Sequence, residues 1–125
     1  MLPARKEPPP RTKVLITGGD PMVGQLVAAL LDNAGYDARF LNGSFFKGPT
    51  EQFDGTRLIV LGPRLKAERR AAILDKIGSV PAISGVPLLD LNPPPDGTQT
   101  GPLHHVRWPC SIEELKREIE ALLVR

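Results

Sequence analysis

Three glycines near the start of the chain are the residues whose spacing most suggests chemistry. In "VLITGGDPMVGQLVAALL", residues 14–31, an apolar run leads into Gly18 and Gly19, and Gly24 lies in the helical pattern that follows. Glycine lets a backbone approach a ligand closely, and a helix that starts at such a turn directs free N–H groups at an anion. The stretch therefore predicts either a phosphate-binding loop or a strand-to-helix turn that has lost its polar pocket.

The first interpretation rests on a resemblance to the opening of the short-chain and extended dehydrogenase families. The residues that match their fingerprint are Thr17, Gly18, Gly19 and Gly24, and the match implies NAD(P) binding at the helix N-terminus. Pro21 stands where the central glycine is needed, and residues 41–43, Leu-Asn-Gly, lack the acid that would hold the ribose. No Tyr-x-x-x-Lys pair is present, since Tyr36 is the only tyrosine. A nucleotide-binding domain is therefore kept as the alternative.

The elements that would position these residues alternate along the chain. Short apolar runs typical of buried strands occupy residues 14–17 and 57–62. Residues 36–41 alternate and predict the second strand, residues 86–91 predict the fourth, and residues 103–108 predict a weaker fifth. Helical patterns follow Asp20-Pro21 up to Gly35, cover residues 64–77 up to Gly78, and begin again at Ser111, where Glu114 completes a capping box. Strands that alternate with helices predict a parallel sheet covered on both faces.

Two segments depart from this alternation. Residues 43–56 offer little helix beyond a turn near Thr50–Phe53. Residues 92–102, "NPPPDGTQTGP", contain three successive prolines and two glycines, which a regular helix does not tolerate. We therefore expect a loop where the fourth helix of an alternating fold would stand.

Composition limits the remaining possibilities. The 125 residues suit one domain, 41% of them are hydrophobic, and no apolar run approaches the length of a membrane span. A single cysteine is typical of a reducing, cytoplasmic setting. The net charge is +2, and several cations lie in "MLPARKEPPPRTK". We expect residues 1–12 to form a flexible, proline-rich tail and residues 13–125 to form the domain.

From about Lys13 to Arg125 the sequence resembles a response-regulator receiver domain. The first strand, Asp20-Pro21 and the helix ending at "NAGY" resemble the opening of such a domain. "VRWPCSIEELKREIEALL" is similar to its last strand, its lysine–proline dipeptide and its final helix. The resemblance implies an α/β, three-layer, flavodoxin-like fold with a five-stranded parallel sheet in the order 2-1-3-4-5. Its active site would lie at the carboxyl ends of the strands.

The residues of that active site are replaced. The resemblance assigns the pocket to Gly18, Gly19, Asp20, Gly62, Asn92, Trp108 and Pro109. Gly18 and Gly19 stand where two acids would hold Mg²⁺, and Gly62 stands where an aspartate would accept the phosphoryl group. Asn92 replaces the hydroxyl residue that would act as the switch, and Trp108 replaces the lysine that would pair with the phosphoryl group. Asp20, which suits a helix cap, cannot assemble this site alone. The resemblance therefore implies a non-enzymatic pseudo-receiver without metal or cofactor.

Other candidate chemistry has simpler explanations. His104 and His105 are adjacent, so on a strand they face opposite sides and cannot share a metal. Cys110 precedes a helix but has no histidine beside it, which favours a partly buried structural thiol. The cations that open the third helical pattern, Arg64, Lys66, Arg69 and Arg70, favour a solvated face over nucleic-acid binding.

Two expectations about surfaces follow from the pseudo-receiver interpretation. We expect partner binding or self-association through the edge formed by residues 103–108 and the last helix, with no membrane contact. We also expect the Trp108 indole to lie over Gly18 and Gly62, since a large ring would fill the space left by lost carboxylates. The resemblance suggests a cis peptide between Trp108 and Pro109.

Overall fold

The computed structural model describes residues 11–92 and 103–124. Its strands are β1 (Lys13–Thr17), β2 (Asp37–Leu41), β3 (Thr56–Leu61), β4 (Leu88–Asp90) and β5 (Leu103–His105). Its helices are α1 (Pro21–Asn33), α2 (Ser44–Lys47), the 3₁₀ turn η1 (Thr50–Phe53), α3 (Ala67–Ser79) and α4 (Ile112–Leu123).

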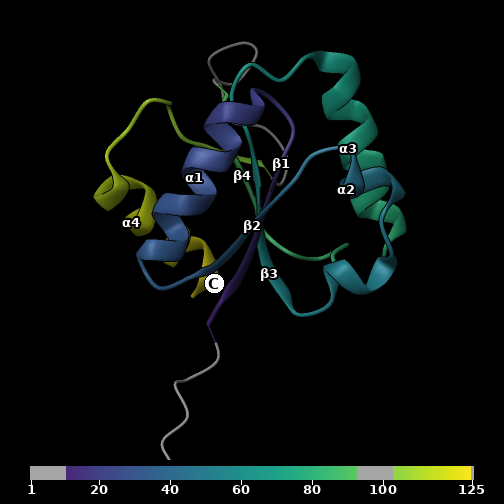
Figure 1. Ribbon diagram of the computed structural model, residues 1–125, viewed down its shortest axis with the longest axis horizontal. Coiled ribbons are helices and arrows are strands. Elements are labelled where there is room, and N and C mark those ends of the chain that lie inside the picture. The colour runs from purple at the N-terminus through teal and green to yellow at the C-terminus, as the bar shows by residue number, and fades with distance from the viewer. Residues whose placement is uncertain (1–10, 93–102, 125) are drawn as a thin grey trace, which may run out of the picture.

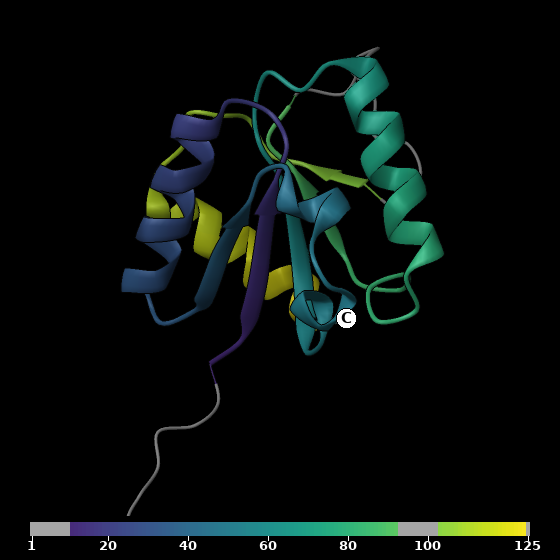
Figure 2. The ribbon, with the colours of Figure 1, turned by 45° about the vertical axis from the view of Figure 1, so that its right-hand side comes forward.

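The strands form one five-stranded sheet, all parallel, in the order β2-β1-β3-β4-β5. This order confirms the predicted flavodoxin-like fold. Helices α1 and α4 cover one face of the sheet, and α2 and α3 cover the other (Figure 1; Figure 2). All five strands therefore end at the same edge, where the loops that follow them meet.

Alternating side chains of the central strands build two separate cores. Ile16 and Val60 belong to the cluster that includes residues of α1 and α4. Leu15, Ile59 and Leu61 belong to the cluster that includes residues of α2, η1 and α3. Because successive strand residues point to opposite faces and both faces are covered, β1 and β3 are apolar almost throughout, as the sequence predicted.

Two helices begin where the sequence predicted, because their caps are local. Asp20 accepts a hydrogen bond from Met22 N at 3.0 Å and Pro21 follows as the first helical residue of α1. Ser111 Oγ accepts one from Glu114 N at 3.1 Å and opens α4. Each cap satisfies an N–H that has no partner inside its helix.

Other boundaries differ from the predictions. Helix α3 begins at Ala67, not at Arg64, because Arg64 has a left-handed backbone with a φ of 64°. Gly78 does not stop α3, which continues to Ser79. Strand β5 ends at His105, three residues earlier than expected.

Helix α2 was not predicted, and it exists because Phe45 packs into the core with Phe53 of η1 at 5.4 Å between ring centroids. The predicted loop in place of a fourth helix, residues 92–102, lies outside the described residues except for Asn92. In the described part of the chain no helix is long and apolar enough to cross a membrane.

Candidate functional site

Glycines join two loops at the carboxyl edge of the sheet. The loop after β1 contains Gly18 and Gly19, with φ angles of 79° and 73° that favour glycine. The loop after β3 begins with Gly62, whose N–H donates to Thr17 O at 3.0 Å, and Pro63 O accepts a hydrogen bond from Asp20 N at 2.9 Å. The two loops therefore lie in direct backbone contact.

This contact leaves no room for side chains at two of the glycines. A Cβ at Gly62 would lie 2.3 Å from Gly18 O, and a Cβ at Gly19 would lie 2.3 Å from Pro63 O. Both obstacles are backbone atoms, which cannot move aside without separating the loops. The glycines thus serve the packing of one loop on the other. Any side chain at position 62, an aspartate included, requires a shift of the first loop.

The third glycine of this group is covered by side chains. A Cβ at Gly18 would lie 2.8 Å from Ile73 Cδ1 and 3.1 Å from Leu65 Cδ1. The prediction that the Trp108 indole covers Gly18 is therefore wrong, because α3 and the loop before it already fill that space.

Trp108 packs elsewhere. It is half-buried against the core cluster that includes residues of α1 and α4. It also lines a cavity of about 350 Å³ together with Asp20, Asn92 and Pro109. The Trp108–Pro109 peptide is cis, as the resemblance suggested. The structure thus brings four of the assigned pocket residues around one cavity, with the Gly18–Gly62 contact beside it.

A buried charge that the sequence reading missed stands at the end of β4. Asp90 has no exposed surface and forms an ion pair with Arg70 of α3. Its Oδ1 accepts hydrogen bonds from Asn92 N at 2.9 Å and Asn92 Nδ2 at 2.6 Å. His105 Nδ1 lies 3.7 Å from its Oδ2. The sequence did contain a signal for this network, namely an acid at the carboxyl end of an otherwise apolar strand. Such a charge is seldom buried without partners.

Asn92 extends this network to the glycine loops. Its Nδ2 donates to Gly62 O at 2.8 Å, and its Oδ1 accepts from Leu65 N at 3.0 Å. Its own carbonyl oxygen lies 2.8 Å from His105 Nδ1. Asn92, expected at a switch position, is thus a fixed link between β4 and the loop after β3.

The remaining candidates occupy separate places. His104 Nε2 lies 2.6 Å from Glu118 Oε1 on α4, on the side of the sheet opposite to His105, so the prediction that the two histidines diverge is confirmed. Cys110 is half-buried. Burial, and then the neighbouring Glu114 carboxylate, raise the pKa of its thiol above the ordinary value.

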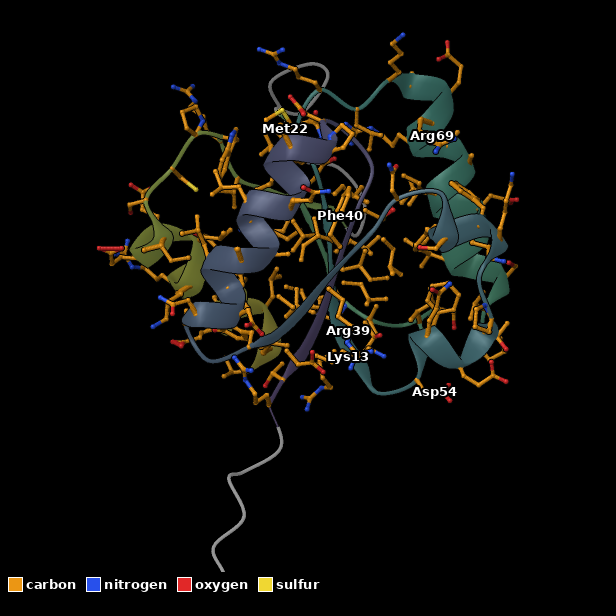
Figure 3. The ribbon with its side chains drawn as sticks, in the orientation of Figure 1. Lys13, Met22, Arg39, Phe40, Asp54 and Arg69 are labelled. Carbon is orange, nitrogen blue, oxygen red and sulfur yellow. The ribbon has the colours of Figure 1, made fainter. Side chains whose placement is uncertain are left out.

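Gly24, the last glycine of the nucleotide fingerprint, has a packing role. A Cβ at this position would lie 2.4 Å from the ring of Phe40, which Figure 3 labels. Gly24 therefore lets α1 approach β2. Asn42, just after β2, offers no carboxylate to a ribose.

Comparison with known proteins shows the fold of response-regulator receiver domains. No family model and no curated protein matches the sequence. Among solved structures, the chemotaxis response regulator CheY4 of Vibrio cholerae is 16% identical, with a TM-score of 0.69 over 90% of this chain and 99% of that one.

Two further structures are similar. The receiver domain of a sensor histidine kinase from Pseudomonas aeruginosa is 17% identical, with a TM-score of 0.69 over 92% of this chain and 99% of that one. A putative pilus assembly-related protein from Burkholderia pseudomallei is 17% identical, with a TM-score of 0.62 over 90% of each chain.

The Pseudomonas domain is described with a magnesium ion coordinated in its active-site cleft. The residues of this chain do not fit such an ion. Mg²⁺ prefers carboxylate and water oxygens, whereas the assigned positions are Gly18, Gly19 and Gly62. Asp20 is engaged as the cap of α1. Within residues 11–92 and 103–124, no group of three or more His, Cys, Asp or Glu side chains could hold a metal.

Proposed function

We propose that this chain is a pseudo-receiver: a signalling module that keeps the receiver fold, is not phosphorylated, and acts through protein–protein contacts. The observation that carries the proposal is the closed contact at Gly62. The position assigned to the phosphoryl acceptor lacks a carboxylate, and a Cβ there would collide with Gly18 O at 2.3 Å.

The chemistry of phosphoryl transfer supports the same proposal. Transfer needs an in-line nucleophile, and a metal ion or cations that neutralise the charge developing on the transferred group. The assigned pocket offers Asp20, which caps α1, and Asn92, whose carboxamide is held by Gly62, Leu65 and Asp90. Asp20 is the one carboxylate among the assigned residues, and it already accepts a hydrogen bond at the start of α1.

The nucleotide-binding alternative is not favoured. Its doubly wound sheet has the order 3-2-1-4-5-6, whereas this sheet has the order 2-1-3-4-5. The space beside Gly19 is taken by Pro63, and the space beside Gly24 is taken by Phe40. The backbone freedom that a pyrophosphate would use is therefore taken up inside the protein.

Two faces could carry the proposed protein contacts. The face predicted from sequence combines β5 with α4, whose outer surface carries charges such as Glu113 and Arg117. A second face lies on α1, where Met22, Leu26 and Leu30 are 80%, 51% and 37% exposed. We keep the β5–α4 face as the proposed site, including self-association, and use α1 as the competing surface in its test. A reducing, cytoplasmic setting remains part of the proposal.

Light scattering and pull-down from the source cell extract test the contact surface. Charge reversal at Glu113 and Arg117 is expected to abolish the dimer or the captured partner, while Leu26→Lys on α1 leaves it intact. The opposite pattern would move the contact to α1. A strict monomer that captures no partner would contradict the proposed mode of action.

A further inference from the structure

A second cavity adjoins the loop after β3, and Arg64 lines both cavities. It has a volume of about 250 Å³ and is bordered by Gly18, Gly19, Asn42 and the segment that leads into α3. Arg64 and Lys66 of this segment and Arg69 of α3 line it. Three cations thus line one cavity, and no acid of residues 11–92 and 103–124 lines it.

The pairing of these three cations is the next feature of the cavity. None of them forms an ion pair within residues 11–92 and 103–124. Arg69 instead lies over the Phe46 ring, 5.0 Å from its centroid, and Figure 3 labels it on α3. Glu68 is on the same helical turn but does not line the cavity. Cations gathered in a concave site focus a positive potential there.

Lys66 and Arg69, which line the cavity, lie at the start of α3, where the first backbone N–H groups have no partner inside the helix. The first hydrogen bond inside α3 runs from Arg70 N to Lys66 O at 2.8 Å, so the N–H groups of Ala67, Glu68 and Arg69 precede it. Lys66, at the cap position, makes no capping bond with its side chain. Arg64 is held beside the cavity by a backbone conformation that only a few per cent of non-glycine residues adopt.

We propose that this cavity binds a small phosphate-bearing molecule, with Arg64, Lys66 and Arg69 as its charged contacts. A guanidinium matches phosphate oxygens with two parallel N–H donors, and an ammonium adds a point charge. The bound phosphate would also face the first N–H groups of α3. The inference goes beyond the proposed protein contacts and does not depend on them.

Amide NMR spectra of the isotope-labelled protein test the site, with inorganic phosphate and pyrophosphate as probes. The buffer contains no other phosphate and no Mg²⁺, and its ionic strength is held constant with NaCl, because salt screens exposed charges. We expect saturable shifts at Gly18, Gly19 and the residues from Leu65 to Arg69, with pyrophosphate binding more tightly. Non-saturable shifts, or shifts spread over all surface cations, would overturn the proposal as an adventitious ion only.

Matched variants separate specific binding from net charge. Arg64→Gln and Arg69→Gln, each made alone, are each expected to weaken pyrophosphate binding about tenfold. Arg57→Gln, an exposed position on β3 outside the cavity lining, makes the control, and it should leave the affinity unchanged. Equal weakening by the control would refute the site. Non-covalently bound phosphate is lost on dialysis, whereas a covalent phosphoryl adduct is retained. Binding in this cavity can therefore fail or succeed independently of the proposal that the chain is not phosphorylated.

Discussion

Replacing Gly62 by alanine tests the closed loop contact directly. The new Cβ would lie 2.3 Å from Gly18 O, which real Cβ atoms do not tolerate, so the backbone of the first loop must move. Overpacking that shifts backbone costs about 1–3 kcal/mol and occasionally more. The φ of Gly62 is not in the left-handed region, so alanine also restricts the unfolded chain, which offsets about 0.4–1 kcal/mol. We expect a net loss of about 1–2 kcal/mol.

Gly78→Ala is the matched control. Gly78 lies in α3, and a Cβ there meets nothing within 4 Å. The same chemical change should therefore stabilise the protein by about 0.5–1 kcal/mol through helix propensity. Urea unfolding, followed by circular dichroism and by the fluorescence of Trp108, gives both values. A Gly62→Ala protein as stable as the Gly78→Ala protein would refute the loop contact.

Three further predictions concern the neighbouring side chains. Removing either partner of the buried Arg70–Asp90 pair leaves the other uncompensated, so Arg70→Met and Asp90→Asn should each cost about 3–5 kcal/mol in urea unfolding, and the double variant should cost less than their sum. Arg64→Gly should stabilise the protein by about 1 kcal/mol and so raise its melting temperature, because glycine adopts the left-handed backbone without strain. An unchanged or lower melting temperature would contradict the assigned conformation. Since burial and Glu114 raise the pKa of Cys110, iodoacetamide at pH 8 should alkylate the native thiol more slowly than the urea-unfolded one, and equal rates would count against that environment.

The sequence predicted the features that depend on local patterns. The apolar strands, the caps at Asp20 and Ser111, and the strand order follow from alternation, from capping chemistry and from a family resemblance. Helix α2 was missed because its stability comes from the packing of Phe45 against Phe53, eight positions later in the chain. The start of α3 was misplaced because a left-handed arginine at position 64 has no sequence signature.

The site was predicted in part for the same reason. The resemblance could assign pocket positions to Gly18, Gly62, Asn92 and Trp108. It could not predict which side chains from other elements pack against these positions. Leu65 and Ile73 cover Gly18 from the second core, and that contact is set by how α3 lies on the sheet. The burial of Asp90 depends likewise on Arg70, which lies twenty positions away in the sequence.

Exposure to a phosphoryl donor tests the central claim most directly. The protein is incubated with acetyl phosphate and Mg²⁺ for mass spectrometry, and with beryllofluoride and Mg²⁺ for amide NMR; a receiver domain that retains its acceptor aspartate serves as the positive control. The account predicts an unmodified mass and no Mg²⁺-dependent saturable shifts at Gly62, whereas shifts at Gly18 that beryllofluoride causes without Mg²⁺ belong to the proposed phosphate cavity. A stable phosphoryl adduct, or Mg²⁺-dependent shifts at Gly62, would contradict it.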